Sequence, residues 1–231
     1  MSKICPMNKK IVLYQDCLEC DEKLCKKEKH KLVIGIDQSY NNTGISICKD
    51  GILTNIRSIH LSTLEDNSRK RNHLAKVLYN LFSKVSVWAS GELVEVYVII
   101  ERIRLQSQGF INIDYIKSIG ALNAVIVDQA KQFNIPVFSV DTRAWKSSIV
   151  GSSKPQNNNL GIDPEKWPTI QFVKSLGFEN KILIPVSKRK KKGVFEINGI
   201  RYTYNDDAAD SACIALYGFL PQNKQKLLPE H

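Results

Sequence analysis

Two apolar stretches of this sequence each end on a carboxylate, and this shared ending constrains the fold more than any other feature. The segment "KLVIGID" ends at Asp37, and the segment "VEVYVIIE" ends at Glu101. Both stretches are rich in β-branched residues, which is typical of buried strands. A charge at the tip of such a strand can belong to a surface turn, to a phosphate-binding loop or to a metal site. The rest of the chain has to separate these readings.

The segments that follow Asp37 predict a sheet with helices packed on it. An alternating segment at 43–49 continues through Asp50-Gly51 into 52–60, and an Asp-Gly turn between such segments predicts a hairpin. Apolar residues spaced three, four and seven apart predict helices over 66–88 and about 112–133. Strands 32–37, 43–49 and 52–60 are therefore expected to form an antiparallel meander.

The second half of the chain continues the alternation of strands and helices. The expected elements are a strand at 135–140, a short helix at 142–149, a polar loop at 151–163, a helix that begins at Pro168, a hairpin at 194–203 around Asn198-Gly199, and a final helix at about 205–219. This order predicts a mixed sheet with helices on its faces, a three-layer α/β fold.

The final helix supplies a third group of acids. It begins "DDAADSACIAL", in which Asp210 shares a helix face with Asp207, three residues before it, or with Asp206, four before it. The rest of the helix is apolar, so acids on its inward side are costly unless a cation neutralises them. Helix capping is the alternative reading for Asp206, because acids stabilise a helix N-terminus. Capping does not explain Asp210, which lies a turn inside.

Acids that converge from strand ends and a helix suit hard divalent cations. Carboxylate oxygens are preferred ligands of Mg²⁺ and Mn²⁺. Two such ions about 4 Å apart can activate a water and stabilise the leaving oxygen in phosphodiester hydrolysis. The sequence therefore predicts a metal site built from Asp37, Glu101 and the acids of the final helix.

Charge favours a polyanionic partner. Lys and Arg total 33 against 23 Asp and Glu, so the formal net charge is +10. A surplus of this size favours nucleic acid, although a basic protein without such a partner is the alternative. No segment has the roughly 18 consecutive apolar residues that a membrane helix needs, and "MSKICPMNKK" lacks a secretory core. We expect a reducing, cytoplasmic setting without membrane contact.

Most cysteines gather near the N-terminus, in the pattern C-x11-C-x2-C-x4-C. They are Cys5, Cys17, Cys20 and Cys25. A C-x2-C pair closes readily on a tetrahedral ion, so we expect a structural Zn²⁺ site, with His30 as a spare ligand. The alternatives are reduced thiols, or a redox pair at Cys17 and Cys20. Cys48 and Cys213 lie in apolar stretches and are expected in the core.

Four motifs in order resemble a known family. "GIDQSYNNTGISI", "VIIERI", "TRAWKSSIVGSSK" and "DDAADSACIAL" are similar to the motifs of RuvC-like Holliday junction resolvases, across about residues 31–220. The resemblance implies an RNase H-like fold with a mixed five-stranded sheet flanked by helices. It also implies a Mg²⁺- or Mn²⁺-dependent endonuclease that cuts four-way DNA junctions with two ions per site, in recombination, repair or branch removal before packaging. The Cys-rich segment resembles phage-encoded members, which would place the protein in the host cytoplasm.

The resemblance also assigns roles to single residues. Asp37 would be shared by both ions, Glu101 would be the second ligand, and Asp207 and Asp210 would match the final pair of acids. Asp206 is then left as a cap or a supporting group. Lys146 would match the family lysine near the scissile phosphate or the attacking water, whereas outside the motif it would read as an exposed lysine.

Two regions depart from the family pattern. The loop after Glu101 is longer, and two arginines precede its first aromatic residue. The residues expected to contact DNA are Arg102, Arg104, Phe110, Lys188, Arg189, Lys190, Lys191 and Lys192. Phe110 or Tyr115 could stack at an opened base step. The tract "KRKKK" would contact phosphates, with a solvated charge run as the alternative.

The expected organisation has three parts. Residues 1–30 form the Cys-rich zinc segment, 31–220 the nuclease domain with a basic hairpin insertion around 186–204, and 221–231 a flexible tail. By resemblance the protein acts as a homodimer, with the helix at about 112–133 as the candidate interface.

Other functional classes remain open on the sequence. An actin-like ATPase or kinase would use Asp37 as a Mg²⁺-nucleotide ligand, although the chain lacks a glycine-rich adenosine loop. A non-catalytic DNA-binding module on a degenerate nuclease fold would leave the burial cost of the acids without compensation. Within the nucleases, transposases usually end on Glu in a longer chain, and ribonuclease H has no cause for the lysine segment.

Overall fold

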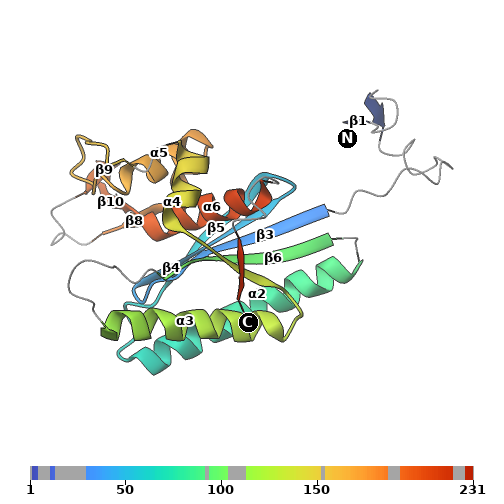
Figure 1. The fold of residues 1–231 in the computed structure, drawn as a ribbon. Helices are drawn as coiled ribbons and strands as arrows, with labels where there is room; N and C mark the ends of the chain where they lie inside the picture. The colour runs from blue at the N-terminus through green and yellow to red at the C-terminus, as the bar shows by residue number, and fades with distance from the viewer. Residues whose placement is uncertain are drawn as a thin grey trace.

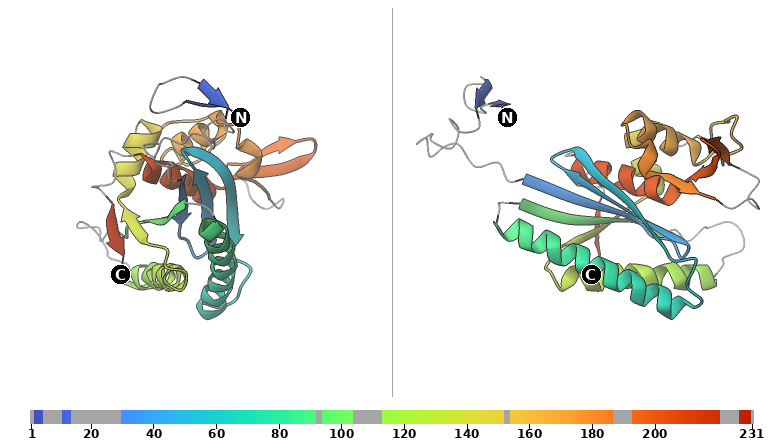
Figure 2. Two further views of the ribbon diagram at one scale, coloured as in Figure 1. Left: turned by 90° about the vertical axis from the view of Figure 1, so that its right-hand side faces the viewer. Right: turned by 180° about the vertical axis from the view of Figure 1, so that it is seen from behind.

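The structure is a computed structural model and describes residues 2–4, 11–13, 30–91, 94–103, 113–151, 154–186, 193–220 and 227–230. Its main feature is a mixed sheet with helices on both faces (Figures 1 and 2). Near the N-terminus, β1 (Ser2–Ile4) pairs antiparallel with β2 (Ile11–Leu13). The four N-terminal cysteines of the predicted zinc site lie outside the described residues.

The main sheet has six strands in the spatial order β11-β7-β6-β3-β4-β5. They are β3 (His30–Asp37), β4 (Asn42–Lys49), β5 (Ile52–His60), β6 (Val94–Glu101), β7 (Val137–Val140) and β11 (Leu228–Glu230). The strands β3, β6 and β7 are parallel, and the other neighbours pair antiparallel. The meander β3-β4-β5 agrees with the prediction, and Asp50 and Gly51 both have positive φ, as the hairpin turn requires.

Helices cover each face of the sheet over its own apolar core. On one face lie α2 (Asn67–Gly91) and α3 (Ile113–Lys131), packed over Ile34 and Ile36 of β3. On the other face α6 (Asp206–Phe219) packs over Val33. Strand residues alternate between the two faces, which is why a continuous apolar run suits β3. Among the described helices, none combines the length and apolar character that a bilayer-spanning segment needs.

Shorter elements surround α6. The predicted short helix at 142–149 is α4 (Thr142–Trp145) followed by one π-helical turn (Lys146–Val150), and the helix predicted from Pro168 is α5 (Trp167–Ser175). The predicted hairpin consists of β9 (Phe195–Ile197) and β10 (Ile200–Tyr204), with Asn198 and Gly199 at positive φ. It belongs to a second sheet in which β10 also pairs with β8 (Leu183–Pro185), after a 3₁₀ turn at Glu179–Lys181. The sequence analysis did not predict β8.

The C-terminal segment departs from the prediction of a flexible tail. Leu228–Glu230 forms β11 and pairs antiparallel with β7, so the main sheet has a sixth strand where five were predicted. A three-residue strand that contains Pro229 carries no alternation to read, and proline is tolerated at a sheet edge because its missing N–H faces outward.

Candidate active site

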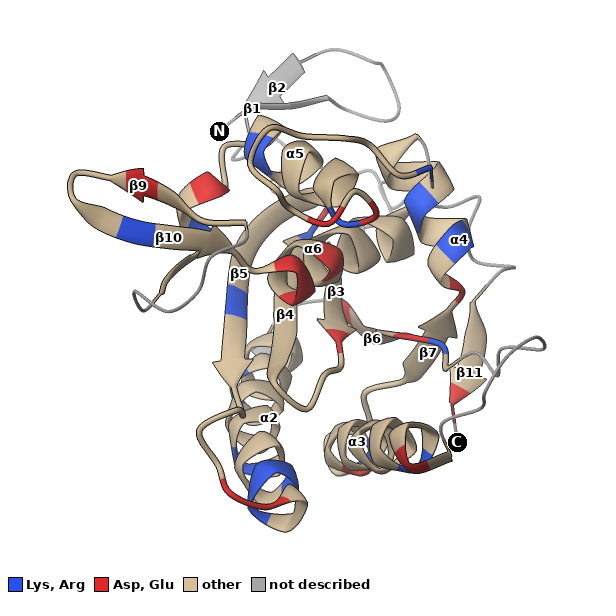
Figure 3. Cartoon of the chain, turned by 90° about the vertical axis from the view of Figure 1, so that its left-hand side faces the viewer, with Lys and Arg blue, Asp and Glu red and all other residues tan. Residues whose placement is uncertain are grey.

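The candidate site begins where two parallel strands end together. Asp37 is the last residue of β3 and Glu101 the last of β6, and the two strands pair in register up to Ile36 and Ile100. The carboxyl ends of neighbouring parallel strands meet at one edge of a sheet, so the two acids lie side by side in the topology. Figure 3 shows the acidic ends of β3 and β6 at the same end of the sheet as the acidic first turn of α6.

Two glycines let α6 lie directly on the backbone of the sheet. A Cβ atom at Gly35 would lie 2.3 Å from the carbonyl oxygen of Ser211, and one at Gly44 would lie 1.9 Å from that of Asp207. Gly44 pairs with Asp37 across β3 and β4. The absence of these two side chains therefore sets the first turn of α6 beside Asp37.

Local hydrogen bonds fix the start of α6. Asn205 is the N-cap, and its side chain accepts a hydrogen bond from the backbone N–H of Ala208 at 3.1 Å. The Oγ atoms of Ser46 on β4 and Ser211 on α6 lie 2.7 Å apart in the buried contact between the strand and the helix. The acids Asp207 and Asp210 thus stand on a helix that is anchored at its first turn and again one turn later.

Burial, together with neighbouring carboxylates, raises the pKa values of three of these acids. Burial, with the charges of Asp210 and Glu101, raises the pKa of Asp37 well above its ordinary value. Burial also raises the pKa of Asp207 to about 7, with Asp206 adding to the rise, and the pKa of Asp210 to about 7, against the opposing charge of Lys146. Desolvation and like charges both disfavour the ionised form, so these acids need a cation to stay charged near neutral pH.

Two side chains next to the acids hold Glu101. The side-chain amide of Gln38 donates a hydrogen bond to the backbone oxygen of Glu101 at 2.6 Å. The hydroxyl of Thr142, at the start of α4, donates to the Glu101 carboxylate. Thr142 was not predicted as a site residue, although it stands at the start of the motif that carries Lys146.

Two lysines approach the acids from different elements. Lys146 is half-buried at the start of the π-helical turn, and its Nζ donates to the backbone oxygen of Glu165 over 3.4 Å. Lys166 forms an ion pair with Asp206. Burial lowers the pKa of Lys166, but the Asp206 hydrogen bond and charge outweigh it, so the pKa rises. Asn205 is the cap, so Asp206 is a partner of Lys166 rather than the capping residue.

Tyr115 also belongs to the surroundings of the acids. It lies in the first turn of α3 with its side chain 61% exposed, and partial desolvation with the charges of Asp37 and Glu101 raises the pKa of its hydroxyl. Arg102 continues from β6, and its backbone N–H donates to the oxygen of Val140 at 2.8 Å. Arg104, Phe110 and the tract 188–192, the other residues predicted to contact DNA, lie outside the described residues.

The chemistry of these residues fits a divalent cation. Hard carboxylate oxygens converge on a half-buried site, and Oδ1 of Asp210 is buried without a hydrogen-bond partner. In the described part of the chain, however, no group of three or more His, Cys, Asp or Glu side chains is arranged to hold a metal ion. The match therefore rests on donor type, burial and raised pKa values, and the side chains would have to draw together around an ion.

Comparison with known proteins gives matches in structure alone. No protein-family model and no curated protein sequence matches the chain. The structure of Thermus thermophilus RuvC matches with a TM-score of 0.51 at 14% identity, over 86% of this chain and 99% of that chain. The same protein in complex with a Holliday junction substrate matches with a TM-score of 0.50 at 13% identity, over 87% and 99%.

A third match has a lower score. The yeast mitochondrial Holliday junction resolvase matches with a TM-score of 0.42 at 18% identity, over 80% of this chain and 75% of that chain. The two RuvC matches establish the fold, which is the predicted RNase H-like arrangement of a mixed sheet flanked by helices.

Proposed function

We propose that the protein is a divalent-metal-dependent endonuclease that cuts four-way and related branched DNA. One observation carries the proposal. Asp37, Glu101, Asp207 and Asp210 come together from two strand ends and a helix, and three of them have raised pKa values. Burying such acids is unfavourable unless a cation offsets their charge.

The fold supports the choice of substrate. The chain spans nearly the whole of Thermus thermophilus RuvC, a protein solved in complex with a Holliday junction substrate. The net charge of +10 favours a polyanionic ligand. Recombination, repair, or branch removal before packaging would each supply such a substrate.

In the proposed reaction the four acids would hold two Mg²⁺ or Mn²⁺ ions. The ions, when bound, would activate a water and stabilise the leaving oxygen of the phosphodiester. Asp37, whose pKa responds to the charges of the other acids, would be shared between them. Thr142 and Gln38 keep Glu101 oriented toward the site. Lys146 would stabilise charge on the scissile phosphate, and Tyr115 would contact a base or the DNA strand next to it.

Cutting of labelled DNA with four-way, three-way and linear structure, in Mg²⁺ or Mn²⁺, tests the proposal. We expect paired symmetric nicks in the four-way junction and little cutting of linear duplex. Asp37→Asn should keep junction binding and abolish cutting. The matched control is Glu196→Gln, which removes the same charge from an exposed position on β9 and should cut normally.

Two results would reject the proposal. Cutting by Asp37→Asn at the wild-type rate would reject the metal-site model. Cutting of linear duplex as fast as the four-way junction would reject selectivity for branched DNA. ATP hydrolysis by the wild-type protein without DNA would instead favour the actin-like reading of Asp37.

The proposal extends to assembly and to the N-terminal segment. A homodimer would place two sites for symmetric nicks, with α3 as the candidate interface, and sedimentation of the purified protein tests it.

Cys5, Cys17, Cys20 and Cys25 would hold one structural Zn²⁺. Elemental analysis should then find one zinc per chain in the wild type and none in Cys17→Ser/Cys20→Ser.

A further inference from the structure

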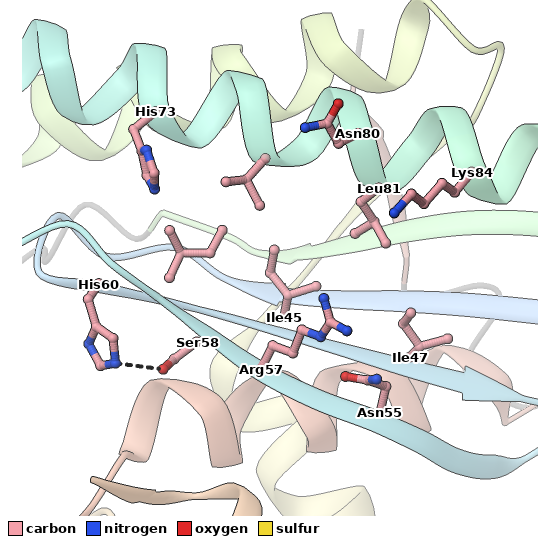
Figure 4. Close-up of a pocket in the computed structure, with 12 residues that line it drawn as sticks. Ile45, Ile47, Asn55, Arg57, Ser58, His60, His73, Asn80, Leu81 and Lys84 are labelled. Atoms are coloured by element: carbon pink, nitrogen blue, oxygen red, sulfur yellow. Dashed lines mark hydrogen bonds between the residues drawn. The ribbon is translucent and has the colours of Figure 1, made fainter. Parts of the chain in front are cut away.

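A groove separates the edge strand β5 from helix α2, on the sheet face opposite α6. It encloses a volume of about 530 Å³ (Figure 4). Ile45 and Ile47 of β4 form its floor, and Asn55 and Arg57 of β5 form one side. The α2 residues that line it recur at the spacing of a single helix face. They are His73, Val77, Asn80, Leu81 and Lys84.

Beside its apolar floor, the groove is lined by cationic and neutral polar side chains and by no acid. Arg57 projects from β5 and Lys84 from α2 toward the same space in Figure 4. Within the described part of the chain, neither side chain forms a hydrogen bond or an ion pair. The elements that line the groove, β4, β5 and α2, contain no Asp or Glu. These cations are therefore free to neutralise an anionic ligand.

The groove is long in one direction. From Asn55 to His60 the strand advances about 17 Å at about 3.4 Å per residue. From His73 to Lys84 the helix advances about 17 Å at about 1.5 Å per residue. A groove of this length can follow several consecutive phosphates of one DNA strand. The shape suits an extended polyanion better than a single small anion.

The groove is separate from the acids. Asp37 of β3 pairs with Gly44 of β4, and Gly44 pairs with Ser58 of β5 at the rim of the groove. The groove and the acids are therefore separated by two strand spacings, or about 10 Å, across the sheet. Arg57 pairs with Ile45, whose side chain packs in the core beneath α2. Arg57 therefore faces α2, whereas the neighbouring row of Gly44 faces α6.

We infer that this groove binds the sugar–phosphate backbone of a DNA strand outside the candidate active site. Arg, Lys and Asn side chains are common donors to DNA phosphates, and the groove offers all three. Because the groove opens along the edge strand next to the acidic end of the sheet, it would hold a DNA segment that leaves the active site past β5. The inference requires DNA as ligand, and it does not require that the protein cuts it.

Binding of a fluorescent four-way junction, measured by anisotropy in EDTA over a series of salt concentrations, tests the inference. Arg57→Gln/Lys84→Gln should raise the Kd about tenfold and reduce the slope of log K against log[salt] by about two, because two phosphate contacts are lost. The matched control, Lys131→Gln/Lys181→Gln, removes two exposed cations outside the groove and should keep the wild-type slope.

The same slope in the groove variant and in the control would overturn the inference. Circular dichroism checks that the variants fold, and Arg57→Lys/Lys84→Arg keeps the charge and should keep the slope. If sedimentation shows that the groove variant loses self-association while its salt slope is unchanged, the groove is an interface between copies of the chain and the inference is wrong. Cutting at saturating DNA reports on the proposed function separately, since a groove variant should retain it.

Discussion

A Cβ atom at Gly44 would lie 1.9 Å from the carbonyl oxygen of Asp207, closer than any ordinary contact allows. Gly44 is also the residue of β4 that pairs with Asp37. One glycine therefore joins the strand-end acid to the acid in the first turn of α6. The close approach of the two backbones brings the separate parts of the candidate site together.

Gly44→Ala should lower the free energy of unfolding by about 1–3 kcal/mol, the usual cost of overpacking a close contact. The obstructing atoms belong to the helix backbone, so the added methyl group can be accommodated only if α6 shifts. That shift would move Asp207 away from Asp37. We expect cutting of a four-way junction to fall strongly, even at a temperature where the variant is folded. Urea unfolding and the cutting assay measure the two effects.

The control for this variant is Gly120→Ala on α3, where a Cβ would meet no atom within 4 Å. Alanine is favoured over glycine inside a helix by about 0.5–1 kcal/mol, so this variant should be slightly more stable than the wild type. A loss of stability equal to that of Gly44→Ala would show that the close approach to Asp207 is not the cause.

Thr142→Val should weaken the site without unfolding the protein. The Thr142 hydroxyl donates to the Glu101 carboxylate, and groups that orient a metal ligand typically contribute about 10–100-fold in metal affinity. The Mg²⁺ concentration that gives half-maximal cutting should rise about tenfold or more. Thr142→Ser, which keeps the hydroxyl, should restore the wild-type value. An unchanged Mg²⁺ dependence in Thr142→Val would mean that this hydrogen bond does not support metal binding.

The positions of the acids at strand ends and in the last helix could be predicted, because these acids interrupt strong apolar patterns. Asp37 and Glu101 end apolar strands, and Asp210 stands inside an otherwise apolar helix. Such exceptions are visible without a structure because burial of an acid conflicts with the surrounding pattern. The same patterns predicted the meander β3-β4-β5 and the helices α2, α3 and α6.

The supporting contacts could not be predicted, because they join residues whose own segments carry no signal. Lys166 and Asp206 are forty positions apart, and the loop before α5 gives no indication that its lysine reaches α6. The groove has the same origin, because Arg57 and Lys84 face each other only once α2 has packed along the edge strand. Strand β11 was not predicted, because three residues that include a proline are too few to show an alternating pattern.

Substitution of the two lysines should separate their roles. Lys166 is already paired with Asp206. Lys146 makes a long hydrogen bond to a backbone oxygen and lies over the Trp145 ring, and its charge opposes the rise in the pKa of Asp210. Lys146→Gln should reduce the cutting rate at saturating DNA by about 10²–10³, the usual effect of removing a group that stabilises developing charge. Lys166→Gln should reduce it less than about tenfold. If Lys166→Gln reduced the cutting rate more than Lys146→Gln, Lys166 rather than Lys146 would be the lysine that acts in catalysis.

Stability should depend on pH in a direction set by the raised pKa values. The pKa values of Asp207 and Asp210 are about 7 in the folded protein, against about 3.9 in an unfolded chain. Between these values the unfolded state binds fewer protons than the folded state, so stability falls as pH rises from about 4 to about 7. Mg²⁺ binds the ionised carboxylates, so it should raise the melting temperature more at pH 8 than at pH 5.

Melting curves in EDTA and in Mg²⁺ at both pH values measure this effect. Asp207→Asn/Asp210→Asn should lose the part of the fall in stability with pH that these two groups cause, and most of the Mg²⁺ response, because only two of the four proposed ligands remain. Asp114→Asn/Asp128→Asn, which changes two exposed acids of α3, should behave like the wild type. If the Asp207/Asp210 variant kept the full Mg²⁺ response, the stabilising ion would bind elsewhere, and these two acids would not be its ligands.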